Sequence, residues 1–215
     1  MSNDPSAAKV RRVARLSQKD ARSETGLFLL EGPQGLKEAV AYPELIDEVF
    51  FTTDARDALA REFELLADAG VELTEVSEQA LKQMADTNTP QGVVAVCRQL
   101  DVAFEDLLES RPLLVAFLAN VRDPGNAGTI LRAADAAGAD AVIFSDSSVD
   151  LYNPKLVRST AGSLFHVPVV IGVDIQQAIA ELKATGIQVF AANGGGQALP
   201  LPQDELAKPT AWVLG

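Results

Sequence analysis

The sequence predicts an α/β protein of two domains, the second of which contains a parallel, doubly wound sheet. In the second half of the chain, short apolar runs alternate with helical patterns, as expected for strands that are buried on both faces. Strands and helices also alternate in the first half, although less regularly, which is typical of a layered α/β domain. With 215 residues, of which 47% are hydrophobic, the chain can bury a sizeable core.

The first domain is expected to span residues 1–100. Its first helix is predicted over residues 7–22, because apolar residues recur there at helical spacing and the arginines face outward. The elements that follow are bounded by turn and capping residues. Strands are predicted within 27–31, 47–52, 71–76 and 93–97, and helices within 33–41, 54–69 and 77–84.

Residues 101–112 contain a short acidic helix and are interpreted as a linker. The second domain is expected to span residues 113–215, with a more regular alternation of strands and helices. Its strands are predicted within 113–118, 141–144, 167–170, 187–192 and 210–214, and its helices over 126–137, from 153 onward and over 175–184.

Residues 120–138 are the most informative stretch of the second domain. An Asp-Pro-Gly turn signal precedes Asn126, which is expected to be the N-cap of a helix of small and aliphatic residues. Arg132 is the one long cation of that helix, at the carboxyl end of a strand, where open α/β sheets bind ligands. The alternative is a solvated helix on which Arg132 pairs with Asp135. The residue types alone support both interpretations equally.

Four segments of the chain share a pattern with one enzyme family. Asn-x-Gly-x-x-x-Arg, from Asn126 to Arg132, resembles the first motif of the SpoU (TrmH-like) RNA 2′-O-methyltransferases of the SPOUT superfamily. Segments 27–32, 89–96 and 153–168 also match, in the same order as in the family. The resemblance implies methyl transfer from S-adenosyl-L-methionine to a ribose 2′-hydroxyl of RNA. Ribosomal RNA is the expected substrate, since the first domain resembles a substrate module that is similar to ribosomal RNA-binding proteins.

The resemblance also implies roles for individual residues. Arg132 would act at the acceptor hydroxyl, and Asn126 would help to shape the site around it. Because the pKa of arginine is above about 12, Arg132 is expected to stabilise developing alkoxide and to bind the adjacent phosphate, rather than to serve as a general base. Ala192 would lie near the cofactor, and Leu214 and Gly215 would open its binding loop.

The last predicted strand has a consequence under the same resemblance. In the family, the corresponding strand enters a loop that bears glycine and glutamate, and a final helix follows. Those segments form a trefoil knot and most of the S-adenosylmethionine pocket. We therefore expect residues 113–215 to lack the threaded end of the knot. The family also works as homodimers, which implies a homodimer here.

The charge distribution indicates where RNA would bind. A net charge of −12 excludes a general nucleic-acid coat protein, because phosphate binding needs clustered cations. Residues 1–25 nevertheless carry six lysines and arginines against three acidic residues. This basic arm is expected either to contact RNA phosphates or to be a solvated helix end. Its candidate RNA-binding residues are Arg11, Arg12 and Arg15.

Other polar residues are weighed in the same way. Lys155 and Arg158 lie one turn apart on a predicted helix and are either RNA contacts or part of a solvated face. His166 is expected to be a hydrogen-bonded core residue without a catalytic role. The triple glycine at 194–196 is interpreted as a turn, since it lacks the spacing of a dinucleotide-binding loop.

Composition limits compartment and cofactors. The single cysteine, Cys97, excludes a disulfide framework and indicates a cytoplasmic protein, with the thiol in the core. No cluster has metal-ligand spacing, and no apolar stretch is long enough to cross a membrane. Two alternatives stay open: a non-catalytic RNA-binding protein, and a tRNA-directed methyltransferase of the same family. A small-molecule enzyme is disfavoured, because phosphate-binding fingerprints are absent.

Overall fold

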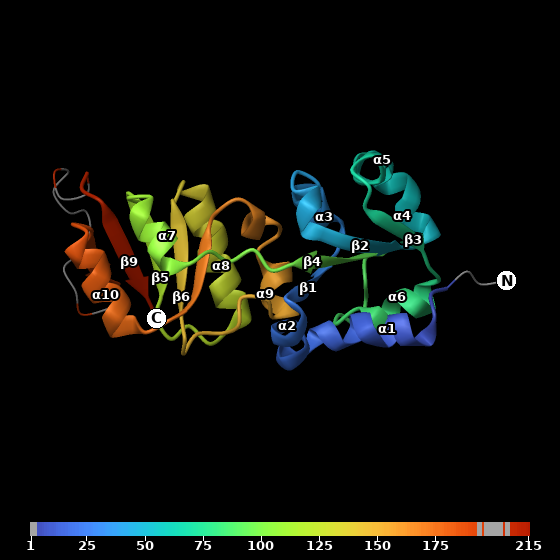
Figure 1. The fold of residues 1–215 in the computed structure, drawn as a ribbon, viewed down its shortest axis with the longest axis horizontal. Helices are drawn as coiled ribbons and strands as arrows, with labels where there is room; N and C mark the ends of the chain where they lie inside the picture. Colours follow the sequence, from blue (N-terminus) through green and yellow to red (C-terminus); the bar gives the residue numbers. More distant parts are fainter. Residues whose placement is uncertain (1–3, 193–194, 196–203, 205–206) are drawn as a thin grey trace. The chain divides into compact units, whose positions relative to one another are not determined.

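The computed structural model describes residues 4–192, 195, 204 and 207–215. The chain divides into two compact units, each with its own sheet (Figure 1). The N-terminal unit comprises residues 1–99 together with 152–165. The C-terminal unit comprises residues 100–151 together with 166–215. No helix in the described part of the chain is long and apolar enough to span a membrane.

The N-terminal unit contains a four-stranded mixed sheet in the order β1-β4-β2-β3. Its strands are β1 (Leu27–Glu31), β2 (Ile46–Phe51), β3 (Glu72–Glu75) and β4 (Val93–Arg98). Strand β4 is antiparallel to both neighbours, whereas β2 and β3 are parallel. The five residues from Val93 to Cys97 are fully buried, because β4 lies at the centre of the sheet with helices on both faces.

Helices cover both faces of this sheet (Figure 1). They are α1 (Ala7–Ala14), α2 (Lys19–Thr25), α3 (Pro33–Ala39), α4 (Thr53–Ala58), α5 (Ala60–Asp68), α6 (Glu78–Met84) and α9 (Pro154–Ser159). Short 3₁₀ turns occupy η1 (Arg15–Ser17), η2 (Pro43–Leu45) and η3 (Ser163–Phe165). One core cluster joins α1 and α6 to the sheet through Val13, Met84 and Val94. On the other face, the rings of Phe51 and Phe63 lie 4.4 Å apart.

The helix that was predicted over residues 7–22 is interrupted. Gln18 is extended, with φ −96° and ψ 138°, and it separates η1 from α2. Arg22 stabilises the break, because its guanidinium donates to the carbonyl oxygens of Leu16 and Ser17 at 2.9 and 2.8 Å. The Arg22 side chain is therefore buried within the arm and is withdrawn from the outward-facing cations. The predicted helix 54–69 is likewise divided at the buried residue Leu59.

The segment 152–165 packs in the N-terminal unit, although the expected division assigned it to the domain 113–215. The ring of Tyr152 lies 4.9 Å from that of Phe28 in β1, and the helix α9 buries Leu156 and Val157. Because its apolar side chains are buried against β1, α9 belongs to the N-terminal unit, although its sequence neighbours belong to the C-terminal unit.

The C-terminal unit contains a five-stranded sheet in the order β7-β6-β5-β9-β8, and all its strand pairs are parallel. The strands are β5 (Leu114–Leu118), β6 (Ala141–Ser145), β7 (Val169–Val173), β8 (Gln188–Ala191) and β9 (Thr210–Leu214). The helices are α7 (Phe104–Glu109), α8 (Pro124–Ala136) and α10 (Ile175–Ala184). The predicted parallel α/β sheet is confirmed.

Helices α7 and α10 share one core cluster with the sheet, to which they contribute Phe104, Leu107 and Leu182. Helix α8 packs on β5 and β6 with buried residues outside that cluster, including Ala127 and Leu131. The acidic helix of the expected linker, residues 101–112, is thus α7 and packs into the core of this unit.

Candidate active site

The carboxyl ends of β5, β9 and β8 meet along one edge of the parallel sheet. The amide of Ala119 donates to the carbonyl oxygen of Leu214 at 2.8 Å, and the amide of Ala192 donates to that of Val213 at 2.9 Å. A Cβ atom on Gly215 would lie 1.8 Å from the carbonyl oxygen of Ala119. The backbones approach so closely here that only glycine fits. The structure therefore brings the candidate cofactor residues Ala192, Leu214 and Gly215 to one edge.

Two serines, Ser145 at the end of β6 and Ser148 just after it, hold the loop that follows β5. The Ser145 hydroxyl accepts from the amide of Asn120 at 3.1 Å. The Ser148 hydroxyl accepts from the amide of Val121 at 3.1 Å and donates to the carbonyl oxygen of Leu118 at 2.9 Å. Asn120 adopts a left-handed conformation with φ 66°, which these bonds help to maintain. Sequence reasoning missed both serines, although polar residues at the carboxyl end of a buried strand are a usable signal for this position.

Asp123, and not Asn126, is the N-cap of α8, so the predicted cap was wrong. The Asp123 carboxylate accepts from the amide of Asn126 at 2.8 Å, and Pro124 occupies the first turn. Both residue types are favoured at these positions, so the helix begins earlier than the predicted residue 126. Asn126 lies within the first turn with an exposed side chain, so its side-chain amide is available for a ligand.

Arg132 is exposed on α8 and makes no ion pair or hydrogen bond within the described part of the chain. Asp135, the alternative partner, instead binds Nδ1 of His166 at 2.9 Å. The His166 side chain is 38% exposed, so the expectation of a core histidine was wrong. Arg132 and Asn126 are six residues apart, which separates them by about 9 Å along the helix and by about 120° around it. The two side chains therefore project from different faces of α8.

Two family models match consecutive parts of the chain. The SpoU rRNA Methylase family matches residues 113–215, and the MRM3-like substrate binding domain matches residues 7–95. The chain is 36% identical over 199 residues to the 23S rRNA (guanosine(2553)-2′-O)-methyltransferase RlmP of Bacillus subtilis, which covers 92% of this chain and 75% of that relative. The chain belongs to the SpoU rRNA methylase family. The resemblance that the motifs indicated is thereby confirmed.

Two further proteins named as rRNA methyltransferases are similar to this chain. The mitochondrial rRNA methyltransferase 3 of Xenopus laevis is 29% identical over 220 residues, and the chain spans about half of its length, 51%. The solved structure of an AdoMet-bound rRNA methyltransferase from Sinorhizobium meliloti superposes with a TM-score of 0.80 at 27% identity. That superposition covers 98% of this chain and 79% of the other. The similarity to that solved structure therefore extends over both units of this chain.

The basic arm of this SpoU protein is largely paired with acidic residues of its own unit. Arg12 and Lys9 both bind the carboxylate of Glu48, which is nearly fully buried, and the Lys9 ammonium also lies 2.8 Å from Glu72. Arg15 is 3.7 Å from Glu24. These pairs reduce the charge that the arm offers to phosphate.

Arg11 is the exception among the three candidate arginines of the arm. It is exposed and has no ion pair among the residues that the structure describes. Arg11 is therefore the candidate whose charge is most available to RNA.

The pairing in the arm changes the titration of Lys9 and Glu72. Burial opposes the charged form of Lys9, but hydrogen bonds and charge interactions with Glu48 and Glu72 outweigh it and raise the pKa of Lys9. The same hydrogen bond from Lys9 lowers the pKa of Glu72. Both shifts favour the ion pair.

Arg158 is engaged within the N-terminal unit, whereas Lys155 on the same helix is exposed. The Arg158 guanidinium lies 2.8 Å from Oε1 of Glu31 and 3.0 Å from Oδ2 of Asp86. Arg158 therefore has a structural role in the N-terminal unit beside its candidate role as an RNA contact.

Predictions were also made for the single cysteine, for the glycine turn and for metal binding. Cys97 is fully buried, as predicted, and burial raises the pKa of its thiol. Gly194 and Gly196, part of the predicted turn, lie outside the described residues. Among the residues that are described, no group of three or more His, Cys, Asp or Glu side chains could hold a metal ion.

Proposed function

We propose that this SpoU protein transfers a methyl group from S-adenosyl-L-methionine to a ribose 2′-hydroxyl of ribosomal RNA. The observation that carries the proposal is the edge where β5, β9 and β8 converge, beside a helix that presents an exposed arginine. Relatives named as rRNA 2′-O-methyltransferases support this reaction, and a solved structure of the same fold is titled as AdoMet-bound.

The residues at this edge fit the cofactor. The backbone of Ala119 fills the space beside Gly215, so the loop after β5 and the end of β9 form a close backbone edge that the small residues here leave open to a ligand on its other side. Ala192, Leu214 and Gly215 would hold S-adenosyl-L-methionine through this edge. When bound, the cofactor supplies an electrophilic methyl group.

Arg132 would stabilise the charge that develops on the acceptor oxygen. Its guanidinium stays protonated, because its pKa is above about 12, so it offers donors; as the methyl passes to the oxygen, the thioether would leave and the hydroxyl proton would pass to water. Its freedom from an ion pair within the described residues leaves the N–H groups available to the oxygen and to an adjacent phosphate.

Asn126 would approach from another face of α8 and fix the ribose by a hydrogen bond. Alignment of this kind is a large part of the acceleration, since well-oriented groups gain roughly 7–11 kcal/mol over free reactants.

The N-terminal unit would hold the RNA. The candidates Arg11, Arg12, Arg15, Lys155 and Arg158 supply positive charge on a chain whose net charge is −12, so the phosphate contact would be local. We further propose that the enzyme acts as a homodimer in the cytoplasm.

The test is methylation of unmodified 23S rRNA transcribed in vitro, followed by mass mapping of 2′-O-methyl nucleosides. We expect one or a few methylated riboses. Arg132→Lys should lower kcat by about 10²- to 10³-fold, as for removal of one transition-state donor, while calorimetric binding of S-adenosyl-L-methionine is retained. Arg61→Lys, an exposed substitution on α5, is the control. RNA binding without cofactor binding or methylation would instead support a non-catalytic RNA-binding protein.

A further inference from the structure

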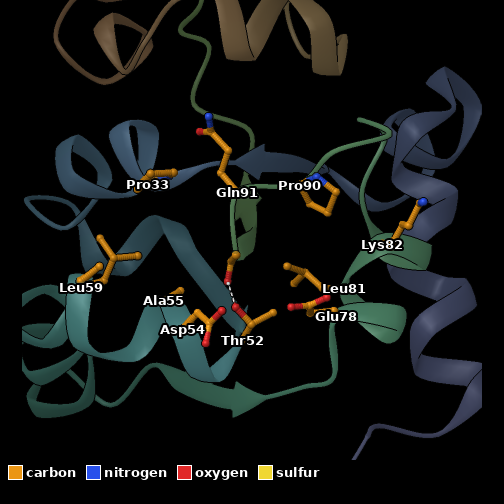
Figure 2. Close-up of a pocket in the computed structure, with 12 residues that line it drawn as sticks. Pro33, Thr52, Asp54, Ala55, Leu59, Glu78, Leu81, Lys82, Pro90 and Gln91 are labelled. Carbon is orange, nitrogen blue, oxygen red and sulfur yellow. Dashed lines mark hydrogen bonds between the residues drawn. The ribbon is translucent and has the colours of Figure 1, made fainter.

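A pocket of about 440 Å³ lies in the N-terminal unit. Its wall is formed by the end of β2, the helices α4 and α6, and the loop that enters β4 (Figure 2). Sites for small organic groups usually enclose about 300–1,000 Å³. The pocket is therefore large enough for one planar ring system.

A close backbone contact fixes the floor of this pocket. The amide of Thr52 donates to the carbonyl oxygen of Gly92 at 2.9 Å. Gly92 has φ +78°, and a Cβ there would lie 2.9 Å from Cβ of Ala55 and 3.1 Å from Oγ1 of Thr52. The loop before β4 is thus held against the start of α4, and the pocket is pre-formed.

The polar groups of the pocket favour a ligand that donates hydrogen bonds. Asp54 and Glu78 lie toward one end of the pocket in Figure 2, and carboxylates only accept hydrogen bonds. Lys82 is the single cation of the lining, so the pocket carries a net negative charge that disfavours phosphate. Neither carboxylate has an ion pair or hydrogen bond within the described residues.

The remaining walls are apolar. Pro33 and Pro90 lie opposite the two carboxylates in Figure 2, and Leu59 and Leu81 also line the pocket. Flat apolar walls accept the face of a nucleobase, while a few polar groups read its edge. An acidic end and apolar walls together match a base whose edge carries adjacent N–H donors.

We propose that this pocket binds an unpaired guanine base of the RNA. The proposal rests on the proposed function, because it takes RNA as the substrate. Guanine presents N1–H and the 2-amino group side by side, and one carboxylate can accept from both. Uracil places carbonyl oxygens on both sides of its N3–H, which a carboxylate repels. Adenine and cytosine each offer a single amino group on that edge.

The test measures binding of fluorescein-labelled RNA hairpins by anisotropy at one fixed salt concentration. The hairpins share a uridine loop with one variable position, which holds guanosine, inosine or uridine. Inosine keeps N1–H and lacks the 2-amino group. We expect the guanosine loop to bind roughly 5- to 100-fold more tightly than the uridine loop, the range for one bidentate contact to a base. The inosine loop should lie between them.

Substitutions of the two carboxylates test whether this pocket causes the preference for guanosine over uridine. Asp54→Asn and Glu78→Gln should bring the guanosine-to-uridine ratio toward one, alone or together. Asp57→Asn is the matched control, because Asp57 lies on the same helix, is exposed and does not line the pocket. It should tighten binding of all hairpins equally, since it removes one negative charge, and should leave the ratio unchanged. Thermal unfolding verifies that the variants remain folded.

Methylation of 23S rRNA by the wild-type protein is measured in parallel. Equal affinity for all loops, or a ratio unchanged in the double variant, overturns the pocket proposal, and continued methylation then leaves the proposed function intact. Equal affinity is also the result expected if the pocket holds a protein segment. Absence of both RNA binding and methylation would overturn both proposals.

Discussion

Nη1 of Arg158 lies 2.8 Å from Oε1 of Glu31, whose side chain is 3% exposed. The same carboxylate accepts from the amides of Asp86 and Thr87 at 3.3 and 3.2 Å. Glu31 ends β1, so one buried charge joins a strand, a loop and a helix from a distant part of the chain. A buried carboxylate of this kind is stable only while its partners remain in place.

Removal of the Arg158 side chain should therefore destabilise the N-terminal unit. Because Arg158 is partly exposed and the two amides remain, we expect Arg158→Ala to lower the free energy of unfolding by about 1–3 kcal/mol. Urea denaturation measures the change. Lys37→Ala, an exposed substitution on α3 of the same unit, should cost less than about 0.5 kcal/mol. Equal losses in the two variants would contradict the assigned role of Glu31.

The serine pair behind the β5–α8 loop predicts an effect on catalysis through position. Ser148→Ala leaves the amide of Val121 and the carbonyl oxygen of Leu118 without their partner, which should cost about 1–3 kcal/mol of stability. Methyl transfer should fall as well, because the loop begins the helix that carries Arg132. Ser147→Ala is the control, since Ser147 is exposed and its hydroxyl bonds only that of Ser145 within the described part of the chain. An unchanged kcat in Ser148→Ala would show that the position of this loop does not affect methyl transfer.

Because Asp123 caps α8 and Asn126 does not, substitutions at these two positions should affect stability and activity differently. Asp123→Ala removes the N-cap of α8 and should cost about 0.5–2 kcal/mol. Asn126→Ala should leave the melting temperature nearly unchanged, because its side chain does not cap the helix, and should lower methyl transfer. Thermal unfolding and kinetics on the same preparations test the pair. A larger stability loss in Asn126→Ala than in Asp123→Ala would restore the original prediction of the cap.

The pair Lys9 and Glu72 predicts a dependence of stability on pH. The pKa of Glu72 is lowered from its ordinary value of 4.5, so its contribution is complete above that pH and is lost as the pH falls through the lowered value. The pKa of Lys9 is raised above its ordinary value of 10.5, so its contribution is lost only at still higher pH. Glu72→Gln should therefore flatten the loss of stability below about pH 4.5. The exposed substitution Glu64→Gln, measured alongside, should leave that slope as in the wild type.

The parallel sheet was predictable because β5 and β6 are apolar over their whole length and are buried on both faces. The interruption at Gln18 was not, since the apolar spacing of residues 7–22 continues through it. What ends that helix is the side chain of Arg22, which binds carbonyl groups that no local pattern marks. Likewise, the apolar periodicity of α9 predicts that one face of the helix is buried. It does not predict which of the two sheets that face packs against.

In the candidate site, too, the sequence motif identified residues but did not predict their geometry. The motif singled out Asn126 and Arg132, and both are exposed on α8. Their roles stay predictions, because a motif gives spacing and not the direction of each side chain. Asp and Asn are similarly favoured as N-caps, so residue type alone did not distinguish Asp123 from Asn126.

The return of residues 152–165 to the N-terminal unit has a consequence during synthesis. The partner of Glu31 and the ring that packs on Phe28 are supplied more than one hundred residues after those positions. A nascent chain of 99 residues therefore emerges with a buried acid unneutralised and a core face uncovered, although domains commonly fold as they emerge from the ribosome. The first unit can complete its folding only after the whole of β5, α8 and β6 has been translated.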